Sequence, residues 1–119
     1  MIKFRRLFKS FRYAIKGFVK IFKEEQNLQI QSLAGVIALF LSWYYQITKN
    51  ELIIVILLIG LVVLMEIINS AIERVTDILK PRINVFVMEI KDIMAAAVML
   101  ASLISIIIGL IIFVPYILK

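Results

Sequence analysis

The sequence predicts an all-α integral membrane protein with three membrane-spanning helices and an amphipathic helix at its amino terminus. The chain has 119 residues, of which 63% are hydrophobic, and its mean hydropathy is +1.03. A soluble domain of this size could not bury so much apolar surface, because small domains bury the smaller fraction of their surface. The apolar residues gather in three long stretches, and the first 23 positions carry many basic residues and no acid.

Residues 1–25 have the pattern of a helix that lies in the membrane surface. Apolar side chains recur there at spacings of three and four, at Phe4, Leu7, Phe8, Phe11, Ile15, Phe18 and Phe22. On a helix this spacing places them on one face and leaves the basic residues on the others. We expect the apolar face to enter the acyl boundary and the basic residues to meet anionic headgroups, so no nucleic-acid partner is predicted.

Three stretches, 28–47, 52–79 and 93–118, are predicted to span the membrane. Each reaches the length of about 20 residues that crossing the ~30 Å hydrocarbon core requires. Aromatic residues at 43–45 close the first stretch, where an interfacial aromatic belt would lie. The whole chain, residues 1–119, is interpreted as one membrane domain.

The connections between these stretches are predicted to be short. Residues 48–51, "TKNE", are expected to form a turn, and Pro81 is expected to break the helix before it. Residues 84–92 are expected to begin the third helix or to form a short surface helix that leads into it.

Basic residues predict the orientation of the chain in the membrane. The first 23 positions and the region 74–92 are rich in lysine and arginine, whereas the opposite side has only Lys49 and Lys119. Because cytoplasmic loops carry the excess of basic residues, we expect a cytoplasmic amino terminus and an external carboxyl terminus.

A polar stripe is predicted along the cytoplasmic half of the second span. Its members recur at spacings of three and four, at Glu66, Asn69, Ser70, Glu73 and Asp77. A charged residue at the centre of a membrane helix costs about 2.5–3.5 kcal/mol on insertion scales, so such residues usually mark a function. For Glu73 and Asp77 a structural alternative stays open: both could sit among the headgroups, paired with Arg74 and Lys80.

Acidic residues of other segments are expected at the same membrane face, namely Glu24, Glu25 and Asp92, the last of these beside Lys91. The chain has no histidine and no cysteine, so acid–base and metal chemistry must use carboxylates, which suit Mg²⁺. Mg²⁺ carrying nucleotide phosphates would join these acids, and a deeper carboxylate, Glu66, suits a general base on an alcohol. This combination predicts phosphoryl transfer to a hydroxyl presented from the bilayer. No soluble-kinase or P-loop motif is present.

Several blocks of the sequence resemble the small prokaryotic integral-membrane kinases that phosphorylate diacylglycerol or undecaprenol. The segment "EIINSAIERVTD" (66–77) is similar to the family signature E-x-x-N-[ST]-A-I-E-x-x-x-D. The blocks "KDIMAAAVML" (91–100), "KSFRYAIKG" (9–17) and "EEQNLQIQ" (24–31) fall at the expected intervals, although Gln29 stands where a basic residue is frequent. The "NLQI" block and the "GLIIFVPYI" ending look more like the Gram-positive branch, which favours undecaprenol.

The resemblance implies a homotrimer in the bacterial cytoplasmic membrane, with active sites shared between neighbouring subunits. It also implies ATP as phosphoryl donor, Mg²⁺ as cofactor and a lipid alcohol as acceptor. By position, Glu66 would be the catalytic base, Glu25 and Glu73 would bind Mg²⁺, and Asn69 would hold the base and the phosphates. The remaining residues implied to contact nucleotide are Arg6, Tyr13, Lys91 and Asp92, with Arg6 also near the lipid and with Ser70 and Asp77 in support.

Two other functions are compatible with parts of the pattern. A small oligomeric channel or proton carrier would use Glu66 as its intramembrane carboxylate, and would account for Asn69. It would not account for Glu25, Lys91 and Asp92 at the headgroup level. A non-catalytic lipid-binding or scaffold subunit is the third interpretation, and ATP-dependent phosphorylation of lipid separates the three.

Overall fold

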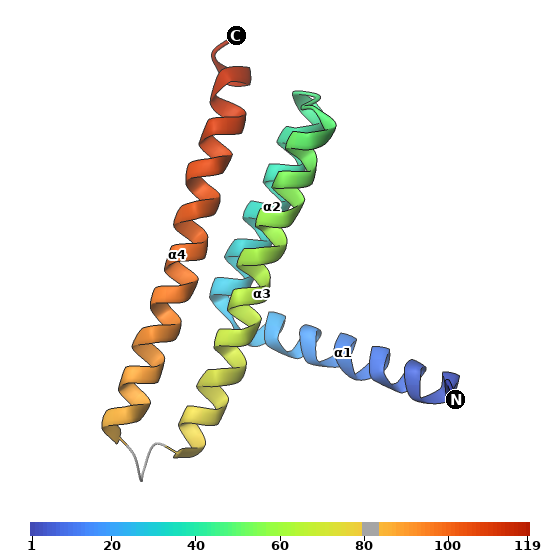
Figure 1. Cartoon of the computed structure of the whole chain (residues 1–119), viewed down its shortest axis with the longest axis vertical. Helices are drawn as coiled ribbons and strands as arrows, with labels where there is room; N and C mark the ends of the chain where they lie inside the picture. Colours follow the sequence, from blue (N-terminus) through green and yellow to red (C-terminus); the bar gives the residue numbers. More distant parts are fainter. Residues whose placement is uncertain (80–83) are drawn as a thin grey trace.

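The computed structural model describes residues 1–79 and 84–119, which form four helices in chain order. These are α1 (Phe4–Glu24), α2 (Gln26–Tyr44), α3 (Lys49–Leu79) and α4 (Asn84–Ile117). The helices α2, α3 and α4 run side by side as a bundle, and α1 leaves the bundle sideways (Figure 1). The expected break at Pro81 lies outside the described residues, whereas 84–92 are the first turns of α4 itself.

Within the described ranges, two helices are long and apolar enough to cross a membrane, Lys49–Leu79 and Val85–Ile117. The helix α2 covers most of the first expected span but has four amide side chains in its first turns, at Gln26, Asn27, Gln29 and Gln31. These amides lower its mean hydropathy relative to α3 and α4. The molecule is therefore an all-helical membrane protein, with two spans supported by length and composition.

The connection between α2 and α3 differs from the expected turn over 48–51. The end of α2 is closed by Gln46, which has a left-handed φ of 47°, and by hydrogen bonds from Gln46 N–H to the Trp43 carbonyl and Ile47 N–H to the Ser42 carbonyl. Thr48 then caps α3, which already begins at Lys49.

The cap is a reciprocal pair of hydrogen bonds between Thr48 and Glu51. The Glu51 N–H donates to Thr48 Oγ1 at 3.2 Å, and the Thr48 N–H donates to Glu51 Oε1 at 3.0 Å. This capping box satisfies two backbone donors that would otherwise lack partners. The Tyr116 hydroxyl of α4 also donates to Glu51, so the cap joins α3 to α4. The prediction of a turn over 48–51 is therefore wrong for 49–51, because T-x-x-E is a helix start.

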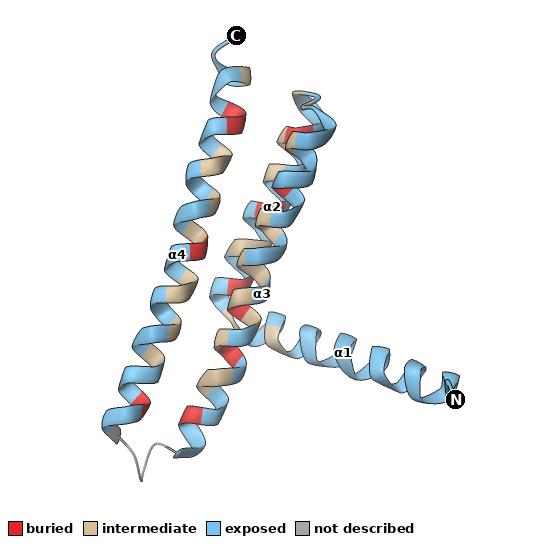
Figure 2. Cartoon of the chain, viewed as in Figure 1, coloured by how far each residue is buried: buried red, intermediate tan, exposed pale blue. Residues whose placement is uncertain are grey.

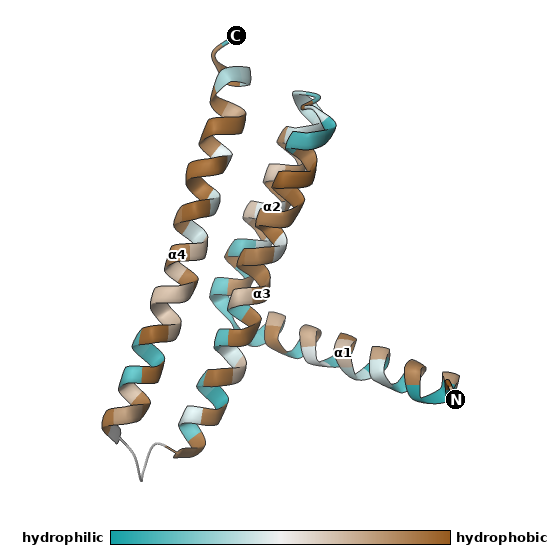
Figure 3. Ribbon diagram, viewed as in Figure 1, coloured by the Kyte–Doolittle hydropathy of each residue, from teal (hydrophilic) through white to brown (hydrophobic). Residues whose placement is uncertain are grey.

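Little of the apolar surface is buried within one chain. The core cluster consists of Val55, Ile112 and Phe113, and most large apolar side chains on all four helices are exposed (Figure 2). Figure 3 shows hydrophilic residues gathered in the second half of α3 and the first turns of α4. A surface of this kind is stable against lipid or against other membrane helices, and it agrees with the class of protein predicted from composition.

The helix α1 has no buried residue and meets the bundle only at its carboxyl end (Figure 1). Its apolar residues Phe8, Phe11 and Ile15 are all more than 60% exposed. An amphipathic helix with an unpacked apolar stripe and a basic opposite face suits the plane of the membrane interface.

Replacing Lys9, Arg12 and Lys16 together by glutamine should loosen α1 from anionic membranes, by about 1 kcal/mol per charge. Activity in anionic vesicles should therefore fall more than activity in neutral detergent micelles. Comparing the two assays on one preparation makes the measurement. An equal loss in both media would mean that these side chains act in the reaction and not in membrane docking.

Candidate functional site

Two of the buried polar residues of α3, Glu66 and Ser70, belong to the predicted stripe, and a third, Thr76, was not predicted. Glu66 is 1% exposed, Ser70 is fully buried and Thr76 is 1% exposed, whereas neighbouring apolar residues such as Leu64 and Ile68 face outward. The heptad-like spacing of the stripe explains this, because residues three and four apart share one side of a helix. The apolar face of α3 is therefore exposed on the outside of the bundle, and its polar face is turned toward α2 and α4.

Among the residues that the structure describes, three buried side-chain polar atoms lack a hydrogen-bond partner: Glu66 Oε2, Ser70 Oγ and Gln31 Oε1. Buried polar groups are normally hydrogen-bonded, so a cluster of unsatisfied acceptors requires an explanation. Gln31 comes from α2, and its side chain and that of Asn69 lie near the Glu66 carboxylate. The sequence predicted Asn69 in this role by resemblance but missed Gln31, because the α2–α3 contact that brings it there is tertiary.

Carboxylates approach Glu66 from two directions. Glu25 and Glu73 both lie close enough to interact electrostatically with it, the first from the junction of α1 and α2 and the second from the next turns of α3. Asn69 Nδ2 donates to Glu73 Oε1 at 3.5 Å and so links the middle of the stripe to its carboxyl-terminal part. Glu25, Glu66 and Glu73 of a single chain are thus near enough to influence one another electrostatically.

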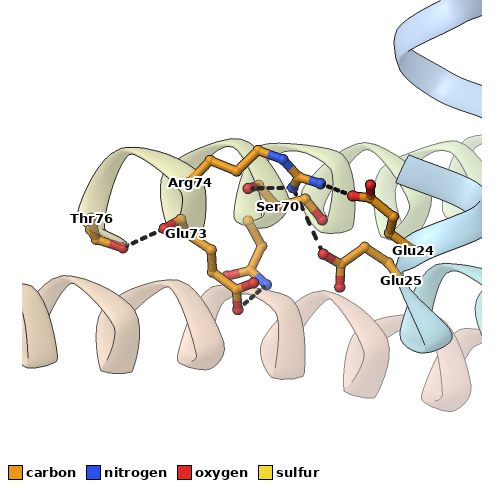
Figure 4. A network of polar contacts seen from close by, with 7 residues as sticks. Glu24, Glu25, Ser70, Glu73, Arg74 and Thr76 are labelled. Atoms are coloured by element: carbon orange, nitrogen blue, oxygen red, sulfur yellow. Dashed lines mark hydrogen bonds and ion pairs between the residues drawn. The ribbon is translucent and has the colours of Figure 1, made fainter. Parts of the chain in front are cut away.

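The junction of α1 and α2 is held by Arg74 of α3. Its guanidinium forms ion pairs with Glu24, and with Glu25 at an Nη1–Oε1 distance of 3.8 Å (Figure 4). The same Nη1 donates to the Ser70 carbonyl at 3.1 Å. Figure 4 shows Glu73 pointing away from Arg74. The structural alternative that paired Arg74 with the acids of its own stripe is therefore wrong, since its partners come from 50 residues earlier.

Lys91 at the start of α4 is tied to the end of the stripe. Its Nζ donates to Asp77 Oδ1 at 2.9 Å, and it also interacts electrostatically with Glu73. Asp77 thus pairs with Lys91, whereas its expected partner Lys80 lies outside the described residues. Asp92, the next residue of α4, is exposed.

Arg6 and Tyr13 are not near this cluster within one chain. Both are exposed residues of α1, which extends away from the bundle beyond its junction with α2 (Figure 1). These two of the four residues that the resemblance implied to contact nucleotide are thus presented outward, where a neighbouring molecule could meet them.

The length of α3 sets the depth of the site. Its 31 residues extend for about 46 Å, more than the ~30 Å hydrocarbon core. A core of about 20 residues counted from Leu52 ends close to Ala71, a little more than one turn beyond Glu66. With the core counted in this way, Glu66 would lie just under the headgroups, whereas Glu73 and Asp77 would lie among them. A buried carboxylate and more exposed acids are thus within a few helical turns of each other.

The donor atoms at this face fit Mg²⁺ delivered with a nucleotide better than a metal held by protein alone. In the described part of the chain, no three acidic side chains are grouped closely enough to hold a metal by themselves. Mg²⁺ at phosphate-transfer sites is usually held by one or two carboxylates together with the phosphates. Glu25 and Glu73, the two carboxylates that interact electrostatically with Glu66, could supply oxygen atoms of this kind.

An apolar cavity of about 290 Å³ opens between α2, α3 and α4 on the membrane side of the site. Gln31 lines its end nearest to Glu66, and the rest is lined by small and aliphatic residues such as Gly35, Ile59 and Ser105. Gln31 therefore contacts both the cavity and the surroundings of Glu66. An apolar cavity with an amide at one end suits a molecule with a long hydrocarbon portion and one polar group.

This fold and site define a small all-helical membrane protein with a carboxylate cluster at the bilayer surface. The sequence profile of "Prokaryotic diacylglycerol kinase" matches residues 12–113. The chain also is 34% identical over 110 residues to the undecaprenol kinase of Bacillus subtilis, an alignment that covers 92% of this chain and 89% of that relative. The chain therefore belongs to the prokaryotic diacylglycerol kinase family, as its motifs predicted. Membership makes it a lipid kinase, a phosphotransferase with an alcohol acceptor.

Further relatives carry the other acceptor in their names. A diacylglycerol kinase of Synechocystis is 30% identical over 101 residues, 84% of this chain and 58% of the relative. The diacylglycerol kinase of Escherichia coli is 27% identical over 104 residues, 87% of this chain and 85% of the relative. No solved structure matches the chain significantly.

Proposed function

We propose that this protein transfers the γ-phosphate of ATP to the hydroxyl of a membrane lipid alcohol, with undecaprenol favoured over diacylglycerol. The observation that carries the proposal is Glu66 Oε2, a buried carboxylate oxygen with no partner, beside two further unsatisfied polar atoms. A lipid hydroxyl brought to this position would supply the missing hydrogen bond. The channel alternative also uses Glu66, but Lys91 and Glu25 at the headgroup level have no part in it.

In the proposed reaction Glu66 accepts the proton of the lipid hydroxyl as the lipid oxygen attacks the γ-phosphorus. The bond between that phosphorus and the β–γ bridging oxygen breaks, which releases ADP and leaves a lipid phosphomonoester. Asn69 and Gln31 steady the Glu66 side chain from two helices. General-base assistance of this kind is typically worth about 10²- to 10⁴-fold in rate.

The nucleotide would lie at the headgroup level, against the acids of the cytoplasmic end. Glu25 and Glu73 would hold Mg²⁺, which offsets the negative charge of the β- and γ-phosphates. Lys91, already held by Asp77 at 2.9 Å, is placed to contact phosphate, with Asp92 beside it. Thr76 donates to the Glu73 carbonyl at 2.9 Å and so stiffens the helix turn that carries one of these ligands.

The arrangement of the membrane helices is part of the proposal. We place α2 as a third span, because its 19 residues extend for about 28 Å, close to the hydrocarbon thickness. We also propose a homotrimer in the bacterial cytoplasmic membrane. The support for an oligomer is the large apolar surface of the single chain and the outward position of Arg6 and Tyr13, which could then reach a neighbour's site.

Three spans place the two ends of the chain on opposite sides of the membrane. A reporter fused before Met1 is expected to lie in the cytoplasm, and one fused after Lys119 to lie outside, as the basic residues require. The measurement is the activity of two reporters fused in turn to each end, one reporter active only in the cytoplasm and the other active only outside. Two ends on the same side would contradict the three-span arrangement.

The substrate is tested by supplying both lipids to the purified protein. With labelled ATP and Mg²⁺, label should pass to undecaprenol faster than to diacylglycerol when the two lipids are compared at equal mole fraction in the same micelles. Two observations support this preference. The "NLQI" block and the "GLIIFVPYI" ending look like the Gram-positive branch, and the chain is 34% identical to an undecaprenol kinase. Faster labelling of diacylglycerol would reverse the lipid assignment, and labelling of neither would favour the channel or scaffold alternatives.

A further inference from the structure

Glu25 is the only residue between α1 and α2, and its conformation decides where α1 points. Its backbone is extended, with φ −102° and ψ 111°, and it ends one helix and precedes the next. We refer to residues 24 and 25 as the elbow. The Glu25 carboxylate is proposed to hold the nucleotide's metal ion. The conformation of the elbow therefore also determines where this proposed ligand lies.

Two side chains from outside the elbow hold it. Gln29 Nε2 donates to the Phe22 carbonyl at 2.8 Å and to the Lys23 carbonyl at 3.4 Å, and so caps the end of α1. The Arg74 guanidinium holds the acidic side chains of the elbow itself. Of the two side chains, Arg74 is the one that contacts the Glu25 carboxylate.

The Arg74 guanidinium contacts three groups at once. One end of the guanidinium pairs with Glu24, and the other is shared between the Ser70 carbonyl at 3.1 Å and Glu25 at 3.8 Å. The planar, multi-donor guanidinium suits such a shared arrangement, which a single ammonium group cannot reproduce. Without it, the adjacent carboxylates at 24 and 25 would repel each other and Glu73 nearby, and α1 would lose its tie to α3.

We propose that Arg74 is a positioning residue: by clamping the elbow to α3, it aims the Glu25 carboxylate at the nucleotide site without touching the substrate. The inference rests on the proposed function, in which Glu25 is a ligand of the nucleotide's Mg²⁺. Arg74 also pairs with Glu24, which has no assigned part in the reaction. This feature makes the proposal testable, because removing either partner breaks the clamp.

The kinetic test uses Arg74→Gln, Glu24→Gln and the double variant, assayed in neutral micelles. Arg74→Gln should raise KM for Mg·ATP by about 10- to 100-fold, the usual effect of losing a group that orients a metal ligand. KM for the lipid should be unchanged. Glu24→Gln should change KM for Mg·ATP in the same direction, and the double variant should be no worse than Arg74→Gln. Arg74→Lys should recover only part of the loss.

Lys23→Gln is the matched control, since it removes one positive charge next to the elbow and leaves the clamp in place. It should leave KM for Mg·ATP unchanged. If Arg74→Gln raises KM while Glu24→Gln does not, Arg74 binds phosphate directly and the positioning role is wrong. Unchanged kinetics in Arg74→Gln would overturn the proposal as well.

A second measurement does not depend on catalysis. The chain has no cysteine, so spin labels can be attached at Ile15→Cys on α1 and Ile78→Cys on α3, two exposed positions. The distance distribution between them, measured with labelled chains diluted in unlabelled ones, should be narrow and should broaden in Arg74→Gln but not in Lys23→Gln. An unchanged distribution would contradict the clamp. A parent protein that phosphorylates neither lipid would refute the proposed function alone, because the distances would still decide whether Arg74 fixes the elbow.

Discussion

Glu66→Gln is expected to lower the rate of lipid phosphorylation by about 10²- to 10⁴-fold, with nucleotide binding largely kept. Glutamine preserves the size of the side chain and its hydrogen bonding to the α2 and α3 amides, but it cannot accept the hydroxyl proton. The variant should fold and should be no less stable, because a neutral amide replaces a buried carboxylate that lacks one partner.

Glu66→Asp makes the matched comparison for this prediction. It keeps the basic group but withdraws it from the hydroxyl by one methylene, so it should restore only a small part of the rate. Lipid phosphorylation and nucleotide binding should be measured on the same preparation. A native rate in Glu66→Gln would show that Glu66 is not the base, and the unsatisfied carboxylate would then favour the channel alternative.

Glu25→Gln and Glu73→Gln are expected to weaken the use of Mg·ATP strongly, since each removes an anionic oxygen from a hard cation. The half-saturating Mg²⁺ concentration should rise in both variants, by about 10-fold or more, the lower end of what the loss of a group supporting a metal ligand produces. KM for the lipid should change little, because the alcohol is bound nearer Glu66. The measurement is a Mg²⁺ titration at fixed ATP.

Asp77→Asn is the control for that experiment. It removes a carboxylate from the same end of α3, but one that pairs with Lys91 and is not proposed to reach the metal ion. Its effect should appear in KM for ATP, through Lys91, with a smaller change in the Mg²⁺ requirement. If Glu25→Gln and Glu73→Gln keep the native Mg²⁺ dependence, the assignment of both ligands is wrong.

The parts of the molecule that follow from local periodicity could be predicted from the sequence. The aromatic stripe of α1 and the polar stripe of α3 depend only on which residues share a helix face. Both helices are present, with α1 unpacked and with Glu66 buried. The prediction of an all-helical membrane protein followed in the same way from composition.

The contacts that assemble the site could not be predicted, because they join segments far apart in the chain. Arg74 was expected beside the acids of its own helix, yet it pairs with Glu24 at a separation of 50 residues. Nothing in the helical period of α3 distinguishes the two partners. Gln31 was missed for the same reason, although a run of amides at the start of an otherwise apolar helix was a usable signal. The start of α3 at Lys49 was predictable, since Thr48 and Glu51 stand at the spacing of a capping box.

The depth of Glu66 bears on how product leaves. A neutral alcohol can bring its hydroxyl beneath the headgroups at little electrostatic cost. A hydrogen bond from that hydroxyl to the unsatisfied carboxylate would favour its binding. After transfer the same lipid carries a phosphate with about 1.5–2 negative charges, in a poorly hydrated place next to acidic groups. In the proposed kinase, one fixed arrangement of charge would thus favour entry of the neutral substrate and departure of the charged product toward water. The product would leave after each turnover without any helix having to move.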